Sequence, residues 1–256
     1  MIDPIDETVR LILTAQKVAV FTGAGVSTES GIADFRSPGG IWSRYDPEDF
    51  TIQRFISDAR ARKRNWQMRR ELVAPDYQPN PAHYALAELE KLGKLSCVIT
   101  QNIDGLHHAA GNSEEKIIEL HGTIKTAKCL DCDDRLPLVD VLQRIDQGEE
   151  DPHCRKCGGL LKAATISFGE AMPQKEMARA EQCSRQCDLF IVIGSSLVVF
   201  PAASMPVIAK NSGARLVILN YTSTDLDSQA DIVIHEKAGA VMQDIIQRVK
   251  QATGGD

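Results

Sequence analysis

Six short apolar runs rich in β-branched residues constrain this chain more than any other feature. The runs are KVAVFT, LSCVITQ, ATISFG, DLFIVIGSS, ARLVILN and DIVIH, and several are nearly continuous rather than alternating. Continuous apolar character predicts strands buried on both faces, as in a parallel sheet. Helix-compatible segments such as PAHYALAELEKLG and FPAASMPVIAKNSG lie between the runs. The sequence therefore predicts an α/β fold with a doubly wound parallel, Rossmann-like sheet whose ligand binds beyond the carboxyl ends of the strands.

Length and charge limit the classes of protein to be considered. A chain of 256 residues that is 43% hydrophobic can bury one sizeable core. A formal charge of -6 provides no general attraction to nucleic acid. The N-terminal segment MIDPIDETVRLILTAQ carries acids where a secretory signal needs a basic start, and no apolar run reaches the length of a bilayer. We therefore expect a soluble cytoplasmic protein with no direct nucleic-acid or membrane partner; its oligomeric state is not predicted.

Two C-x2-C pairs, CLDC and CRKC, predict a metal site. Their four thiols can close tetrahedrally around Zn²⁺ and leave no open position, so the zinc is expected to be structural. The expected ligands are Cys129, Cys132, Cys154 and Cys157. A redox pair or two unrelated turns are the alternatives. A nucleic-acid-binding zinc ribbon is disfavoured because the acidic segments DCDD and DQGEEDPH would repel phosphates.

The remaining cysteines, Cys97, Cys183 and Cys187, have no partner at metal spacing. In a protein that is not exported, thiols are more common than a disulfide framework. We expect Cys97, which lies in a predicted strand, to act as a small buried hydrophobic residue.

These patterns predict one Rossmann-like domain with two insertions. The domain is expected to comprise residues 1–40, 82–124 and 161–256. Residues 41–81 are rich in charge and contain no strand-like run, which predicts a helical insert. Residues 125–160 contain the cysteine pairs and few large apolar residues, which predicts a zinc-binding module that needs its metal to fold.

A glycine turn directly follows the first predicted strand. Gly23, Ala24 and Gly25 allow the close backbone approach and exposed amides that a pyrophosphate needs. The third glycine of a G-x-G-x-x-G motif is missing, because Thr28 occupies that position. An ordinary tight turn between strand and helix would explain the glycines about as well.

The segment SGIADFRS behind the glycines places Asp34, Phe35 and Arg36 side by side. An aromatic residue in a segment with little helix or strand signal would be exposed unless it covers something. A lid over a bound ligand explains all three residues. The alternative is that Phe35 anchors the loop locally on the surface of the domain.

Two further clusters follow apolar segments, the predicted strand LSCVI and the segment KIIEL. In TQNIDGLHHAAG, the amide and carboxylate side chains of Gln101, Asn102 and Asp104 stand where a doubly wound sheet presents groups to its ligand. For the adjacent histidines, His107 and His108, a packing or capping role is expected. In ELHGT, His121 is placed as a general base near neutral pH, although a structural histidine is the usual alternative.

Taken in order, GAGVSTESGIADFRS, TQNIDGLH, ELHG, the two C-x2-C pairs, SFGE, GSSLVVFPA and LVILN resemble the sirtuins, NAD-dependent protein-lysine deacylases. The resemblance covers nearly the whole chain, from about residue 18 to 242. It implies that the segment behind the glycines is a mobile loop that closes over NAD, continuing into the helical insert.

The resemblance also implies roles for individual residues. His121 would be the catalytic base, and Asn102 would help to organise the ribose and nicotinamide site. The implied NAD contacts are Gly23, Ala24, Gly25, Ser27, Thr28, Asp34, Phe35, Arg36, Gln101, Ile103, Asp104, Gly194, Ser195, Ser196 and Asn220. The implied contacts with an acyl-lysine peptide are Ile166, Phe168, Gly169, Val198 and Val199.

The implied reaction is not a zinc-assisted hydrolysis. The acyl oxygen of a modified lysine would attack C1′ of the nicotinamide ribose and expel nicotinamide, and His121 would then help to deprotonate a ribose hydroxyl. The products would be lysine, nicotinamide and O-acetyl-ADP-ribose. The strand-like SLVVFP would pair with the backbone of an acyl-lysine protein or peptide.

The acyl preference is less constrained by the sequence. Sirtuins usually carry proline where this chain has Ala33 and Ala163, which removes no reacting group. Some members that remove acidic acyl groups carry Tyr-x-x-Arg, and here Trp66 precedes Arg69 at that spacing. We favour acetyl, because the cluster Arg60, Arg62, Lys63, Arg64, Arg69 and Arg70 is more simply a solvated helix face. A desuccinylase, a protein ADP-ribosyltransferase and a non-enzymatic NAD sensor are the alternatives.

Overall fold

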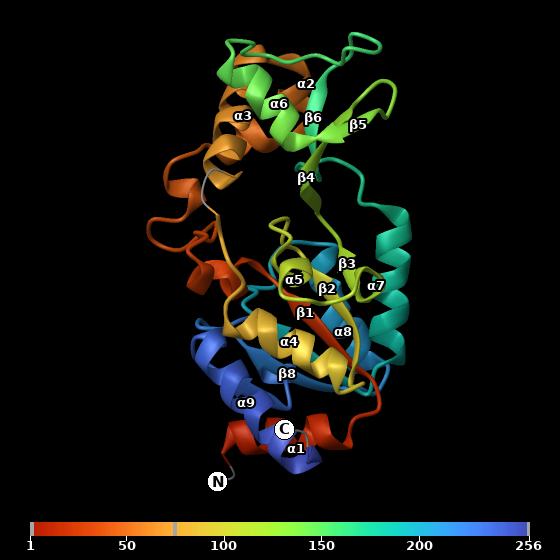
Figure 1. Ribbon diagram of the computed structural model, residues 1–256. Helices are drawn as coiled ribbons and strands as arrows, with labels where there is room; N and C mark the ends of the chain where they lie inside the picture. Colours follow the sequence, from red (N-terminus) through yellow and green to blue (C-terminus); the bar gives the residue numbers. More distant parts are fainter. Residues whose placement is uncertain (1–2, 74–75, 255–256) are drawn as a thin grey trace.

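The computed structural model describes residues 3–73 and 76–254, which form a large and a small lobe (Figure 1). The large lobe contains a six-stranded sheet of order β3-β2-β1-β7-β8-β9, in which all neighbours are parallel. Its strands are β1 (Val18–Thr22), β2 (Leu95–Thr100), β3 (Ile117–Glu119), β7 (Leu189–Ile193), β8 (Arg215–Leu219) and β9 (Ile232–Ile234). The order reverses between β1 and β7, so the predicted doubly wound sheet is confirmed.

Helices cover both faces of this sheet. Side chains of α1, α4 and α9 pack against one face, and side chains of α7 and α8 pack against the other. These helices are α1 (Pro4–Thr14), α4 (Pro81–Lys91), α7 (Gln174–Gln186), α8 (Met205–Asn211) and α9 (Ala238–Thr253). Along β1, Val18 and Val20 belong to the first core, whereas Ala19 and Phe21 belong to the second. The apolar run of β1 is continuous because each face needs apolar side chains.

Short elements complete the connections. They are α5 (Leu106–Ala109) and the 3₁₀ helices η1 (Ala24–Ser30), η2 (Ile41–Ser43), η3 (Pro47–Phe50), η4 (Glu114–Lys116), η5 (Ala202–Ser204) and η6 (Asp227–Gln229). Within the described ranges, no helix is long and apolar enough to cross a membrane.

The small lobe, at the top of Figure 1, combines three helices with an antiparallel sheet of order β5-β4-β6. Its elements are α2 (Ile52–Ser57), α3 (Ala59–Val73), β4 (Gly122–Cys129), β5 (Arg135–Pro137), α6 (Leu138–Asp146) and β6 (Leu161–Thr165). Residues from both predicted insertions share one core, in which Trp66 of α3 packs with Cys129, Leu138 and Cys154. The helical insert therefore supplies apolar surface that the cysteine-paired segment lacks.

The prediction that ATISFG forms a strand of the parallel sheet is wrong. β6 contains the first residues of this run and pairs antiparallel with β4, with Ala163 opposite Ala127. Every residue of β6 is buried, so it has the same continuous apolar signal as a parallel strand. A continuous apolar run therefore indicates that a strand is buried, but it does not indicate the sheet to which the strand belongs.

The prediction of a solvated helix face is wrong for two arginines of α3. Arg62 is 8% exposed and makes a bidentate pair with Asp151, with N–O distances of 2.8 and 2.6 Å. It also donates to the carbonyl oxygens of Phe55 and Ile56. Arg69 is 7% exposed. A partner far along the chain, which helical periodicity does not reveal, allows Arg62 to be buried.

A disulfide corrects the description of Cys97 as a simple buried hydrophobic residue. Cys97 of β2 is bonded to Cys183 of α7, across a sequence separation of 86 residues. Both elements contribute to the same core, which brings the two sulfurs together. Cys187 is a buried free thiol. Spacing along the sequence identifies metal knuckles, but it carries no signal for a pair this far apart.

Candidate active site

A cavity of about 1020 Å³ lies beyond the carboxyl ends of β1, β2, β3, β7 and β8, where both lobes contribute to its walls. With one exception, the residues predicted to contact NAD or the acyl-lysine peptide line this cavity. The exception is Val198, which is 48% exposed and lies outside the lining. The structure therefore brings together six of the motifs, which are separated by up to about 200 residues in the sequence.

The glycine turn packs against the end of β7. The Gly25 amide donates to the carbonyl oxygen of Gly194 at 2.8 Å. A Cβ atom at Gly25 would lie 2.8 Å from that oxygen, and one at Gly194, where φ is +63°, would lie 2.2 Å from the amide nitrogen of Val26. Glycine is therefore required because two backbone segments touch here. The turn continues as the 3₁₀ helix η1 and not as the α-helix of a standard dinucleotide motif.

The loop behind η1 is folded by its own residues. Asp34 accepts hydrogen bonds from the amides of Arg36 and Ser37 and from the Ser37 hydroxyl, at 3.1, 2.8 and 2.6 Å. Phe35 is half-buried and its ring lies 5.2 Å from that of Trp42. Trp42 in turn contacts Phe50 at 5.4 Å between ring centroids. Phe35 is therefore both a cavity-lining residue and a local anchor, so the two alternatives are not exclusive.

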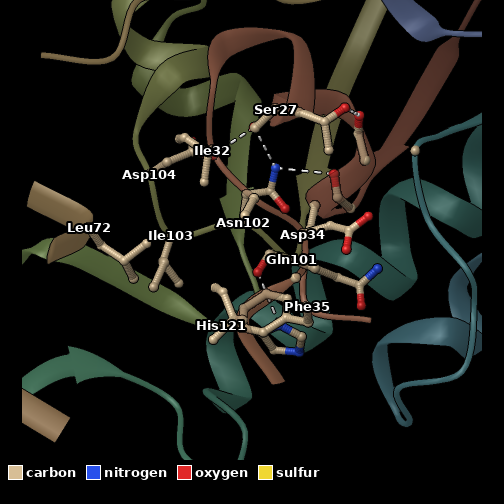
Figure 2. Close-up of a pocket in the computed structure, with 18 of the residues that line it drawn as sticks. Ser27, Ile32, Asp34, Phe35, Leu72, Gln101, Asn102, Ile103, Asp104 and His121 are labelled. Carbon is tan, nitrogen blue, oxygen red and sulfur yellow. Dashed lines mark hydrogen bonds between the residues drawn. The ribbon is translucent and has the colours of Figure 1, made fainter. Parts of the chain in front are cut away.

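The loop after β2 presents three polar side chains to the cavity (Figure 2). Asn102 donates from Nδ2 to the Ser27 hydroxyl at 3.0 Å and to the carbonyl oxygen of Gly23 at 3.2 Å. Ser27 donates to Oδ2 of Asp104 at 2.8 Å, and Gln101 donates to Oγ of Ser195 at 2.9 Å. These bonds connect the loop to η1 and to the end of β7.

His121 lies at the junction of the two sheets. The amide of Leu120 still donates to Thr100 of the large sheet, whereas Gly122 begins β4 and pairs with Thr165. Gly122 has a φ of +72°, and a Cβ atom there would lie 2.2 Å from the carbonyl oxygen of Ala164. Only glycine allows the chain to pass from one sheet to the other directly after His121.

The tautomer of His121 follows from its hydrogen bond. Nδ1 lies 3.1 Å from the carbonyl oxygen of Gln101, which can only accept, so Nδ1 carries the hydrogen. Nε2 then keeps a lone pair. Burial lowers the pKa of His121, and the Gln101 carbonyl opposes that shift. The ring is therefore neutral near pH 7 and able to accept a proton.

The residues predicted to contact the acyl group follow β6. Phe168 exchanges backbone hydrogen bonds with Phe50 and Ile52, at 3.1 and 2.9 Å, which attach this turn to α2. Glu170 accepts from the Ser167 amide at 3.0 Å and pairs with the buried ammonium group of Lys162 at 2.9 Å. The Lys162–Glu170 pair was not predicted, and it anchors the turn that carries Phe168 and Gly169.

Arg69 was predicted to lie on a solvated helix face, but it is buried in the wall of the cavity. Its Nη2 donates to Oγ1 of Thr165 at 3.1 Å, and its Nε has no partner among the described residues. Burial lowers the pKa of its guanidinium to about 10, which still leaves it charged at neutral pH. Trp66 and Leu72 lie three residues before and after it, so helical spacing already placed Arg69 on the apolar face of α3.

The far end of the cavity contains groups suited to a ribose or phosphate. The Ser195 side chain lies beside the glycine turn, and Ser196 also lines the cavity. Asn220 donates from Nδ2 to the carbonyl oxygen of Thr222 at 2.7 Å, which leaves its own Oδ1 as an acceptor. Donors near the glycines and an acceptor after β8 match the polar groups of a dinucleotide.

The four predicted metal ligands form one cluster, in which all Sγ atoms lie within 4.8 Å of one another. The Cys129–Cys157 and Cys132–Cys154 sulfur pairs are 3.5 and 3.8 Å apart. A tetrahedral zinc with bonds of ~2.3 Å requires sulfur separations of ~3.8 Å. The donor set fits Zn²⁺ with four protein ligands and no open position. The cluster is not part of the cavity lining, which agrees with a structural role.

Comparisons with known proteins agree with this geometry. The model of the Sir2 family matches residues 23–201. An NAD-dependent protein deacetylase of Thermodesulfovibrio yellowstonii is 48% identical over 97% of this chain and 96% of its own length. A solved Sir2 enzyme superimposes with a TM-score of 0.89 at 42% identity, over 98% of this chain and all of the other. A Sir2 complex with a deacetylated p53 peptide and 3′-O-acetyl ADP ribose has a TM-score of 0.88 at 35% identity, over 98% and 99% of the two chains.

Proposed function

Because the chain belongs to the Sir2 family and is an NAD-dependent protein deacylase, we propose that its cavity binds NAD against the Gly23–Gly25 turn and an acyl-lysine side chain beside Ile166. The single observation that carries this proposal is the position of His121. It is a neutral histidine with its Nε2 lone pair available, and it lines the same cavity as the glycine turn and the Ile166–Gly169 segment.

The dinucleotide would be held along the end of the large sheet. Ser195, Ser196 and the amide of Ala24 would bind its phosphates, because the Gly23 and Gly25 amides already donate to the carbonyl oxygens of Ile193 and Gly194. Oδ1 of Asn220 would accept from a ribose hydroxyl. Asp104 would receive the amide hydrogens of the nicotinamide carboxamide, because a carboxylate can accept more bonds than the two it already makes. NAD supplies a ribose carbon that an acyl oxygen can attack as nicotinamide leaves.

The protein contributes alignment and proton transfer. Phe168 and its backbone contacts with α2 would place the acyl-lysine side chain, and Asn102 would hold the ribose end of the cofactor. His121 would accept a proton from a ribose hydroxyl through Nε2, while Gln101 stabilises the resulting cation through Nδ1. The cysteine cluster lies outside the cavity and would stabilise the small lobe without entering the reaction.

The stoichiometry of the reaction tests this proposal. Purified protein is incubated with an acetyl-lysine peptide, with and without NAD, and the peptide and small molecules are measured by mass spectrometry. We expect one nicotinamide and one O-acetyl-ADP-ribose for each lysine released. Release of free acetate without consumption of NAD would contradict it.

A second candidate activity is removal of acyl groups that end in a carboxylate. The specific observation that favours it is Arg69, a buried guanidinium in the cavity wall with a hydroxyl partner and no carboxylate partner among the described residues. A succinyl carboxylate could pair with this cation, which an acetyl group cannot. Deacetylation stays the leading activity, because relatives at up to 48% identity bear that name.

The ratio of kcat/KM for succinyl-lysine and acetyl-lysine peptides tests the second candidate. Arg69→Met should lower this ratio about tenfold or more, because a charge-assisted hydrogen bond is lost only for succinyl. Arg70→Met is the matched control, since the neighbouring Arg70 is 60% exposed and pairs with Asp146 at 2.9 Å. Equal ratios in wild type and Arg69→Met would contradict it. Protein ADP-ribosylation and a cytoplasmic location stay predictions.

A further inference from the structure

A buried chain of polar side chains lies behind the Gln101–Asp104 loop and has no role in the mechanism above. Its members are Thr22 at the end of β1, Asn80 and His83 at the start of α4, Thr100 at the end of β2 and His107 in α5. None of them lines the cavity, and each is at most 5% exposed. Polar groups this deep are costly unless they are hydrogen-bonded, which makes their partners informative.

The hydrogen bonds of this group show which atom donates and which accepts in each pair. Thr22 donates to Oγ1 of Thr100 at 2.8 Å, so the hydrogen in its contact with His107 comes from the ring. His107 Nε2 therefore donates to Oγ1 of Thr22, at 2.9 Å. Oγ1 of Thr100 also accepts from the amide of Asn102 at 3.0 Å. The imidazole of His107 is thus connected, through two hydroxyl groups, to the backbone of Asn102.

The chain of bonds closes on itself. The Asn102 side chain donates to Ser27, and Ser27 donates to Asp104 (Figure 2). Asp104 accepts from the amide of Leu106 at 2.9 Å, which fixes the first turn of α5 and therefore His107. The residues between β2 and α5 are held in a closed hydrogen-bonded circuit, and one side of that circuit faces the cavity.

A second histidine extends the group toward η1. His83 Nδ1 accepts from the amide of Asn80 at 3.3 Å, so its hydrogen is on Nε2. The His83 and His107 rings are 4.9 Å apart, and the remaining His83 Nε2 and His107 Nδ1 have no hydrogen-bond partner among the described residues. The Asn80 side chain donates to the carbonyl oxygen of Val26 at 2.7 Å and to Oγ of Ser30 at 3.0 Å. The group therefore spans both segments that flank the proposed nicotinamide site.

Both rings are neutral. Burial lowers the pKa of His83 to about 4, and burial with the nearby His83 and His108 lowers the pKa of His107 well below its usual range. A neutral ring keeps one N–H and one lone pair. In His107 the N–H donates to Thr22, and in His83 the lone pair accepts from the Asn80 amide. Neither histidine is therefore poised to exchange protons near pH 7.

We propose that His107 is a positioning residue for NAD binding: by donating to Thr22 it holds Thr100 and α5 in place, and thereby fixes the Asn102 amide and the Asp104 carboxylate. The proposal rests on the proposed function, because it takes this loop as the nicotinamide and ribose site. His107 does not touch the cofactor, so its effect is on the geometry of the groups that do.

Three variants test this role. His107→Leu removes the donor, and His107→Gln keeps an N–H at a similar distance from the backbone. His108→Gln is the control on the same helix, since His108 pairs with the exposed Glu114 at 2.9 Å. Calorimetry measures the Kd for NAD, steady-state kinetics measures KM for NAD and kcat, and circular dichroism verifies folding. Thr22→Val breaks the same circuit one bond away and replaces His107→Leu if that variant does not fold.

We expect His107→Leu to raise the Kd and KM for NAD about tenfold or more, as loss of a buried hydrogen bond does, with a smaller change in KM for the peptide. His107→Gln should recover most of the affinity. A folded His107→Leu or Thr22→Val protein that binds NAD as wild type does would overturn the proposal, and so would equal losses in His108→Gln. Wild-type protein that binds NAD without deacylation would refute the proposed function alone, because the comparison of Kd values still decides the role of His107.

Discussion

Replacement of Arg69 by methionine should make the protein more stable. The guanidinium is buried, and burial lowers its pKa from its usual range to about 10, which is roughly two to three units lower. At about 1.4 kcal/mol per pKa unit, the charged side chain costs the folded state about 3 kcal/mol. Below pH 10 the Arg69 side chain is charged in both the folded and the unfolded protein, so the whole cost of burying its charge is present at neutral pH. This cost disappears only as the pH rises above 10 and the buried side chain loses its proton. Methionine fills a similar space without charge.

The gain is partly offset by a lost hydrogen bond. Removing the bond from Nη2 to Thr165 costs about 1 kcal/mol, so the expected net stabilisation is about 2 kcal/mol. Urea denaturation at pH 7.5, followed by tryptophan fluorescence, measures this difference. Arg62→Met should do the opposite, because it strands Asp151 and leaves two carbonyl oxygens without their donor. An Arg69→Met protein less stable than wild type would refute the view that this cation is uncompensated.

Three further properties can be predicted from individual groups. Cys154→Ser should reduce the zinc content and the stability of the small lobe, and a metal-free protein as stable as wild type would refute the structural role. Cys97→Ser should lower the free energy of unfolding by about 4 kcal/mol, because the lost disulfide closes a loop of 86 residues. A thiol count that finds both cysteines reduced in the wild-type protein would contradict the bond. Burial lowers the pKa of His83 to about 4 in the folded state, so the free energy of unfolding should be highest above pH 6.5, where the ring is neutral in both states. It should fall by about 3 kcal/mol on acidification to pH 4. Denaturation measured at both pH values should show a smaller loss for His83→Gln.

Local sequence patterns identify the parallel strands β1, β2, β7, β8 and β9 and the zinc ligands for clear physical reasons, whereas the short strand β3 was not among the predicted runs. A strand such as β1 needs apolar side chains on both faces. Four thiols on two C-x2-C turns can coordinate a single metal ion tetrahedrally. Polar residues at strand ends were also informative, because parallel strands gather their carboxyl ends at one edge. Gln101 was predicted as a site residue on this ground, whereas Ser195, 94 residues away, was predicted from the resemblance to the sirtuins, and the two side chains are in direct contact.

The features that sequence reasoning missed depend on partners far along the chain. Arg62 is buried by Asp151, and Cys97 is bonded to Cys183, so neither outcome is visible in a window of neighbouring residues. β6 was assigned to the wrong sheet because burial on both faces looks alike in either sheet. The burial of Arg69 could have been predicted from neighbouring residues, because Trp66 and Leu72 lie three residues before and after it on the same helix face. The many charged residues around it instead favoured a solvated face.

The role of His121 is the most direct test of the account. Single-turnover deacetylation of an acetyl-lysine peptide is measured for wild type, His121→Ala and the exposed-loop control His153→Ala, with NAD affinity determined for each. The account predicts that His121→Ala loses about 100-fold or more in rate while it still binds NAD, because general base catalysis contributes about that much. A His121→Ala enzyme that deacetylates the peptide at the wild-type rate would contradict the account.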